Sequence, residues 1–152
     1  TAETLNRYGV SATLTEASWY STGYGDQRFD AVVDVVSMQH ISIHESIRAI
    51  SEVSRVLKNG GLFFSYRLGI ASALFSKLLA AGAVMVDNST VENIPPPLPL
   101  ANNGVTSFWD ADVANFVFDK SGLVIEGIER YEHTSSVGEH VEYLGITARK
   151  SC

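Results

Sequence analysis

Residues 29–66 read FDAVVDVVSMQHISIHESIRAISEVSRVLKNGGLFFSY and decide the fold class. Residues 31–36 are apolar and mostly β-branched apart from Asp34, which is typical of a strand covered on both faces. Residues 62–66 form a second apolar run. Between the runs Ser42 stands three residues before Glu45, the pattern of a capping box that opens a helix. The stretch therefore predicts a strand, a helix and a strand, with the two strands parallel.

The expected helix has one apolar face and one charged face. Asn59-Gly60-Gly61 is expected to end it, since glycine tolerates the left-handed backbone of a helix terminus. The apolar positions are Ile43, Ile47, Ile50, Val53 and Leu57, and the charged ones are Glu45, Arg48, Glu52 and Arg55.

Function in a sheet of this type is expected beyond the carboxyl ends of its strands. Those ends are residues 37–40 after the first strand and residues 66–67 after the second. Asp34 lies late in the first strand, where a buried charge must be paired or functional.

At these residues the sequence resembles the class I S-adenosylmethionine-dependent methyltransferases. Three segments look like consecutive elements of that family. Its fourth strand resembles FDAVVDVVSMQHI, the following helix resembles EVSRVLKNGG, and the fifth strand resembles LFFSY. Asn59 stands where the family usually has proline. The alternatives are another doubly wound α/β domain with a well-capped helix and, less well matched, half of an NAD-binding oxidoreductase.

The resemblance extends over nearly the whole chain. It makes residues 10–14 the third strand and places Glu16 and Ala17 where the family often binds the adenine of its cofactor. FWDADVANFVFDKSGLVI, from residue 108, is similar to the late helix and sixth strand. Residues 123–131 and 140–149 alternate as strands and are expected to pair as an antiparallel hairpin, matching the family's reversed last strand.

The resemblance implies a three-layer α/β fold, with a mostly parallel sheet, helices on both faces and an antiparallel C-terminal hairpin. We expect residues 1–152 to form a single methyltransferase-like domain that begins at the third strand. Residues 70–104 are the expected lid or insertion, with an apolar helix first and an irregular, proline-rich part from residue 87.

Two cofactor motifs of the family are missing from the sequence. One is the G-x-G-x-G loop after the first strand, and the other is an acid at the end of the second strand, which holds the ribose. Gly23-Tyr24-Gly25 is no substitute, because it follows no apolar strand and precedes no helix. The expectation is an N-terminally incomplete domain whose sheet is completed by a missing N-terminal segment or by another copy, since unpaired buried strand edges are unfavourable.

The resemblance implies methyl transfer from S-adenosylmethionine to a small-molecule acceptor. His40 is the candidate general base, although a histidine that bonds the loop backbone is the alternative. Tyr66 and Arg67 are the candidate substrate contacts, with an acid as the alternative partner of Arg67. The second functional hypothesis is a non-catalytic, methyltransferase-like interaction module. The candidate cofactor-binding residues are Glu16, Ala17, Asp34, Val35 and Val36.

Composition restricts partners and compartment. The net charge is −6 and the pI about 5.1, which does not favour nucleic acid or an anionic membrane as a partner. No apolar run is long enough to span a bilayer, and no metal site is predicted. Cys152 is the single cysteine and has no internal partner, which favours a reducing compartment, the cytoplasm.

Overall fold

The strand, helix and strand predicted from residues 29–66 are present in the computed structural model, which describes residues 2–151. β1 (Phe29–Val35) pairs in parallel with β2 (Leu57–Leu68), and α2 (Ile43–Val56) connects them. Thr1 and Cys152, the cysteine on which the compartment prediction rests, lie outside the described residues.

The main sheet has the strand order β1-β2-β7-β6. β6 (Leu123–Thr134) and β7 (His140–Lys150) form the predicted antiparallel hairpin, and β7 also runs antiparallel to β2. The sheet is therefore mixed, and the expectation of a mostly parallel sheet is corrected. The reason is that the described strands contain only one strand–helix–strand crossover, and hairpin strand β7 occupies the other side of β2.

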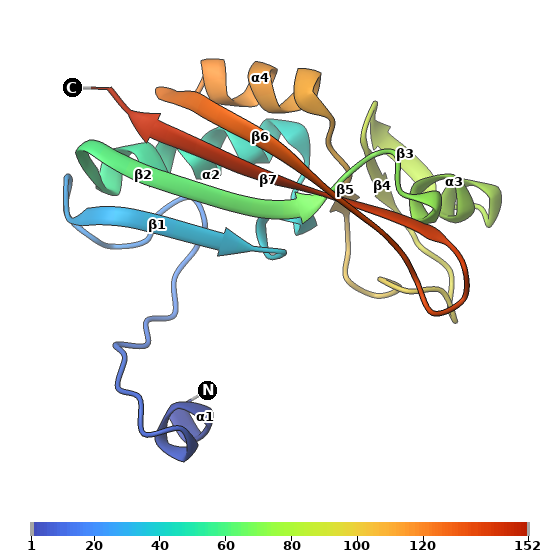
Figure 1. Ribbon diagram of the computed structural model, residues 1–152, viewed down its shortest axis with the longest axis horizontal. Helices are drawn as coiled ribbons and strands as arrows, with labels where there is room; N and C mark the ends of the chain where they lie inside the picture. The colour runs from blue at the N-terminus through green and yellow to red at the C-terminus, as the bar shows by residue number, and fades with distance from the viewer. Residues whose placement is uncertain (1, 152) are drawn as a thin grey trace.

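α2 and α4 (Ala111–Asp119) lie on one face of this sheet (Figure 1). Phe63 of β2 is 0% exposed and stacks on Phe118 of α4, with ring centroids 6.0 Å apart. Ile50 of α2 and Ile146 of β7 belong to the same core. Burial of each such side chain stabilises the fold by about 1.5–3 kcal/mol.

The opposite face of the sheet carries no helix among residues 2–151 (Figure 1). On that side Val33 and Val35 of β1 are 66% and 55% exposed. The α/β fold class is confirmed, but the described residues form two layers at the main sheet, and the second helical layer that we expected is not among them.

The first 28 residues differ most from expectation. α1 (Ala2–Arg7) is short, Gly9 follows it with φ 65°, and α1 lies apart from the sheet (Figure 1). Residues 10–14 were predicted as a strand but are irregular and exposed. Their alternating pattern is insufficient, because a strand needs a neighbour to take its backbone hydrogen bonds.

After β2 the chain forms a small unit of its own, which we call the cap (residues 70–107). It contains α3 (Ala73–Ala80), β3 (Val84–Asp87), β4 (Thr90–Glu92) and β5 (Thr106–Ser107). The three strands make a second sheet in the order β3-β4-β5. The expectation of an irregular chain from residue 87 is corrected, because β4 is buried against an apolar cluster that includes Leu78 and Phe108.

The end of α2 also differs from the expected one. α2 ends at Val56 and β2 begins at once, so the predicted terminus at Asn59-Gly60-Gly61 lies within the strand. Gly60, with φ 75°, falls at an irregularity in the β1–β2 pairing and provides a left-handed step there.

Candidate functional site

The chain turns sharply where β1 ends. Val36 has φ 52°, a left-handed conformation that costs a β-branched residue about 1–2 kcal/mol. Its N–H donates to the Tyr66 carbonyl oxygen at 2.8 Å, which ties the turn to the end of β2. The 3-10 helix η1 (Met38–His40) follows directly. Backbone strain of this kind persists where surrounding contacts hold it, and it is common at functional sites.

Asp34 holds this turn in place. Its carboxylate, 4% exposed, accepts hydrogen bonds from Ser37 N–H at 3.3 Å, Met38 N–H at 3.1 Å and Ser65 Oγ at 3.0 Å, and also from Ser37 Oγ. The buried charge is therefore satisfied by the protein itself. Val35 and Val36, the other two candidates at this strand end, are exposed.

Arg67 is the most deeply buried charge at this end of the sheet. It is 0% exposed, and its Nη2 donates to the Met38 carbonyl oxygen at 3.2 Å and to Ser107 Oγ at 2.9 Å. Its guanidinium carbon lies 3.2 Å from the centroid of the Trp109 ring, a cation–π contact. Burial lowers the pKa of Arg67 to about 9, against a raising effect of Asp34, so the side chain is cationic at neutral pH.

The cap is fastened over these groups. Ser107 Oγ donates to the Gln39 carbonyl oxygen at 3.1 Å, and the Gln39 side chain accepts from the Leu68 N–H at 3.2 Å. At the start of α2, Asp87 Oδ2 accepts from the Ile43 N–H at 3.2 Å. The cap thus packs against the carboxyl ends of β1 and β2.

His40 ends η1 beside these contacts. The residue is half-buried, and its Nδ1 is buried without a hydrogen-bond partner in the described part of the chain. The alternative in which His40 bonds the loop backbone through this nitrogen does not occur here. Its role as a base stays a prediction.

Tyr66 and Arg67, the two candidate substrate contacts, point to opposite faces of the sheet, as successive strand residues do. Tyr66 lies on the face without helices, where its ring stacks on Tyr143 at 4.8 Å and meets Tyr131 edge-on at 5.6 Å. Arg67 lies on the helix side, beneath the cap. The two side chains therefore cannot approach one ligand from the same face.

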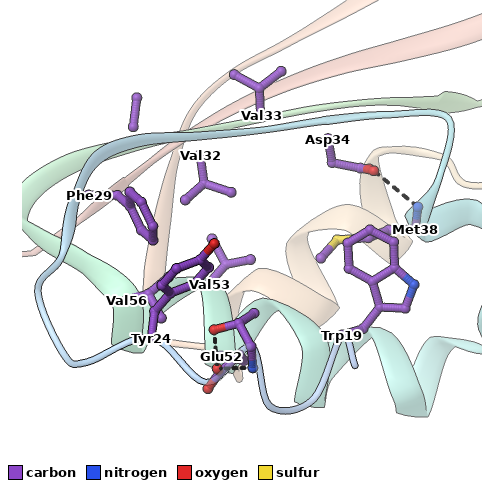
Figure 2. Close-up of a pocket in the computed structure, with 12 residues that line it drawn as sticks. Trp19, Tyr24, Phe29, Val32, Val33, Asp34, Met38, Glu52, Val53 and Val56 are labelled. Carbon is purple, nitrogen blue, oxygen red and sulfur yellow. Dashed lines mark hydrogen bonds between the residues drawn. The ribbon is translucent and has the colours of Figure 1, made fainter. Parts of the chain in front are cut away.

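A second region lies beyond β1. A partly open cavity of about 270 Å³ lies between the loop 19–28, β1 and α2, with Trp19, Tyr24 and Met38 among its lining residues (Figure 2). Trp19 and Tyr24 also line a neighbouring cavity of about 380 Å³, whose wall includes Ala17. Glu16 is exposed and does not line either cavity.

Glu52 fixes the loop that forms these cavities. It accepts from the Thr22 N–H at 2.7 Å, from Thr22 Oγ1 at 2.8 Å and from Arg55 Nε at 2.7 Å. Arg55 also pairs with Asp26 at 2.6 Å. The hydrogen bond from Arg55, followed by those from Thr22, lowers the pKa of Glu52 to about 2.

The helical period predicts that Glu52 and Arg55 lie on the charged, solvent-facing side of the helix. The prediction is wrong for Glu52, whose side chain is buried and only 8% exposed. The three-residue spacing of Glu52 and Arg55 in the sequence indicates that they can pair on one helix face. It does not indicate which loop the pair binds. The loop partners Thr22 and Asp26 are about thirty residues away in sequence.

Comparison with known proteins identifies the arrangement. The model of a family described as methyltransferase domain matches residues 2–65. Among solved structures, an S-adenosylmethionine-dependent methyltransferase from Methanosarcina mazei superposes with a TM-score of 0.72 at 19% identity, covering 89% of this chain and 65% of its own. The chain has the class I methyltransferase fold. No curated protein matches the sequence.

The methyltransferase fold is found in neighbours with different reactions. One is a Burkholderia thailandensis 1,6-didemethyltoxoflavin-N1-methyltransferase with bound S-adenosylhomocysteine, with TM-score 0.67, 15% identity and coverage of 99% of this chain and 56% of that one. Another is the [4+2]-cyclase SpnF, with TM-score 0.66, 18% identity and coverage of 99% and 60%. The chain spans less than two thirds of the length of each of the three structures.

The methyltransferase-like chain has no helix among its described residues that is long and apolar enough to cross a bilayer. Within the same residues no group of three or more histidine, cysteine, aspartate or glutamate side chains is placed to hold a metal ion.

Proposed function

We propose that this chain takes part in methyl transfer from S-adenosylmethionine to a small-molecule acceptor. The observation that carries the proposal is the fold itself, which superposes over 89% of the chain on an S-adenosylmethionine-dependent methyltransferase. The acceptor proposal draws support from a neighbour whose substrate is a small heteroaromatic molecule. A cytoplasmic location is proposed with it.

The residues present fit the adenosine half of the cofactor. The cavity next to Ala17 combines the aromatic rings of Trp19 and Tyr24 with the hydroxyl groups of Thr13 and Thr15. Aromatic faces and hydroxyls suit a flat heterocycle and a ribose. We propose that Ala17, and Glu16 after a local rearrangement, contact the adenine, and that Val35 and Val36 pass beside the cofactor. Asp34 would act by holding their turn rather than by direct contact.

When bound, S-adenosylmethionine supplies an electrophilic methyl group, so the protein has to orient the acceptor and exclude water. The cap is the element suited to exclude water, because it packs over the carboxyl ends of β1 and β2. His40, whose Nδ1 has no partner among the described residues, is the proposed base that accepts a proton from the acceptor.

Titration of the full encoded chain with S-adenosylhomocysteine tests the function, and calorimetry should show saturable binding. The Glu16→Ala substitution should weaken it by about 1.5–3 kcal/mol, the value of one charge-assisted hydrogen bond. Glu3→Ala, an exposed acid in α1, is the matched control and should change nothing. Absence of binding to the unsubstituted chain would contradict the proposal, and equal affinity of Glu16→Ala would remove only Glu16 from the site.

A second candidate is a non-catalytic interaction module. It is favoured by the free edge of β1 and by the exposed Val33 and Val35 beside it. Completion of the sheet by another segment or another copy of the chain stays a prediction. This reading requires that S-adenosylhomocysteine does not bind, so the same titration separates the two functions.

A further inference from the structure

Unpartnered polar atoms concentrate at one place in the described part of the chain. Eight buried side-chain nitrogen or oxygen atoms lack a hydrogen-bond partner there, and only one of them, Ser46 Oγ, lies on the body of α2. The other seven lie within the cap or at its contact with η1 and the end of β2, in His40, Arg67, Ser89, Thr90, Thr106 and Trp109. Native proteins satisfy nearly all such atoms, so a cluster of exceptions indicates a missing ligand or water.

The strongest of these groups can only donate. They are Nε and Nη1 of Arg67 and Nε1 of Trp109, and the two side chains are stacked, with 3.2 Å between guanidinium carbon and ring centroid. Guanidinium and indole groups have no acceptor atoms. Whatever satisfies them must therefore bring acceptors. Thr90, whose hydroxyl also has no partner among the described residues, pairs with Ser107 in the cap sheet, and Ser107 is the residue that Arg67 contacts.

The charge of Arg67 also lacks a direct counter-ion. Its two protein hydrogen bonds go to the Met38 carbonyl and to Ser107 Oγ, which are neutral. Asp34 is the acid that acts on it electrostatically, but the hydrogen bonds that this carboxylate accepts come from Ser37, Met38 and Ser65. A buried cation without a hydrogen-bonded anion is unfavourable, which makes this position receptive to a negatively charged group.

We propose that Arg67, with the Trp109 N–H, binds a carboxylate of the methyl acceptor, so that the acceptor is an organic acid. This inference rests on the proposed function. A carboxylate fits better than a phosphate, because the closed contact between the cap and η1 leaves Arg67 0% exposed and a planar group needs less displacement of the cap. Entry of the acid requires β5 to separate from η1, where Ser107 Oγ donates to the Gln39 carbonyl oxygen.

The test follows the Arg67 Nε–Hε resonance in ¹⁵N-labelled full chain saturated with S-adenosylhomocysteine. Sodium benzoate is the anionic probe and benzamide its neutral isostere, at matched ionic strength. Benzoate should shift the resonance saturably and benzamide should not. Trp109→Phe, which keeps the aromatic stack and removes the donor, should weaken benzoate binding about 10- to 150-fold, the range that a hydrogen bond to a charged acceptor gives.

Arg67→Lys should weaken benzoate binding at least about tenfold, since a buried lysine loses its charge more readily and does not reproduce guanidinium geometry. Arg28→Lys, an exposed arginine in the loop before β1, is the matched control and should leave binding unchanged. Far-ultraviolet circular dichroism and thermal unfolding of each variant check its fold, and Trp109→Phe decides the case if Arg67→Lys does not fold.

An equal response to benzamide, or no response of Arg67 to benzoate while S-adenosylhomocysteine binds, would overturn the inference. If S-adenosylhomocysteine fails to bind but benzoate still shifts the Arg67 resonance, the anion site is upheld and the methyl-transfer proposal fails. The two failures are therefore distinguishable.

Discussion

At the residue scale, Glu52 shows how one buried side chain organises a distant loop. Its carboxylate joins α2 to the loop 19–28 through Thr22 and Arg55, and the loop in turn forms both cavities beside β1. Glu52 is charged at every pH above about 2, because the bonds from Arg55 and Thr22 favour the ionised form.

We predict that Glu52→Gln lowers the free energy of unfolding at pH 7 by about 1–3 kcal/mol, since it replaces charge-assisted hydrogen bonds with neutral ones. The folded-state pKa of about 2 is below the ordinary 4.5, so the contribution is present above pH 4.5 and is lost as the pH falls toward 2. Urea denaturation at pH 7 and at pH 3 measures both effects.

The difference in the free energy of unfolding between the unsubstituted chain and Glu52→Gln should shrink on acidification. Glu126→Gln, which removes an exposed ion pair with Arg149, serves as the control and should change stability by less than about 0.5 kcal/mol. A stability difference that is unchanged between the two pH values would show that the Glu52 charge is not the cause.

At the scale of elements, the start of α2 is secured from two sides. Ser42 accepts from the Glu45 N–H at 3.3 Å, and the Glu45 side chain accepts in return from the Ser42 N–H at 3.0 Å, which confirms the predicted capping box. Asp87, from the cap, accepts from the Ile43 N–H. Ser42 and Glu45, at the start of the helix itself, thus satisfy part of its N-terminus. Asp87, 44 residues from Ile43, satisfies a further backbone N–H.

Ser42→Ala should reduce the free energy of unfolding by about 1 kcal/mol, because two backbone N–H groups lose their capping partner or its orientation. Ser51→Ala, at an exposed position within the same helix, is the matched control. Thermal and urea unfolding of both variants measure the effect. An equal loss of stability from Ser51→Ala would argue against a specific role of the Ser42–Glu45 capping box.

Asp87→Ala should loosen the cap without unfolding the main sheet. The substitution removes the bond to α2 and the local bond to the Ser89 N–H at 3.0 Å. Amide hydrogen exchange at Thr90 and Val91 should accelerate about 5- to 30-fold, the factor that corresponds to 1–2 kcal/mol. Exchange in β2 and β7 should stay unchanged.

Asp112→Ala, in the first turn of α4, provides the comparison for this experiment and should not affect β4. If exchange accelerates equally in the main sheet, the cap and the sheet open as one unit, and a cap that moves separately is ruled out.

At the scale of the whole molecule, the main sheet is covered on one face and bare on the other among the described residues (Figure 1). β1 is the edge strand, and its outward valines have no packing partner of the kind that the helix side provides. Edge strands with exposed apolar side chains tend to recruit another chain.

We therefore predict that the 152-residue chain binds a fluorescent apolar dye such as ANS, and that Val33→Lys with Val35→Lys reduces this binding while the circular dichroism spectrum is kept. Val137→Lys, at the exposed tip of the β6–β7 hairpin, adds one lysine away from the sheet face and should have little effect. Undiminished dye binding in the double variant would show that the sheet face is not the apolar surface in solution.

The sequence by itself determined the parts of the fold that depend on short-range patterns. Two apolar runs around a capped amphipathic helix predicted β1, α2 and β2, and alternating runs around Gly138 predicted the β6–β7 hairpin. The same residues carried the resemblance to methyltransferases, which the comparisons confirm. Such patterns are readable because periodicity, caps and turns are local consequences of backbone geometry.

Tertiary structure alone decided which groups meet. The contact of Arg67 with Trp109, the capture of Thr22 by Glu52 and the docking of Asp87 on α2 each join segments 30 or more residues apart. It also decided that residues 10–14 do not form a strand and that β4 does. The physical reason is that a strand, a buried charge or a second helix cap is stable only when a partner from elsewhere in the chain satisfies it, and no local pattern specifies that partner.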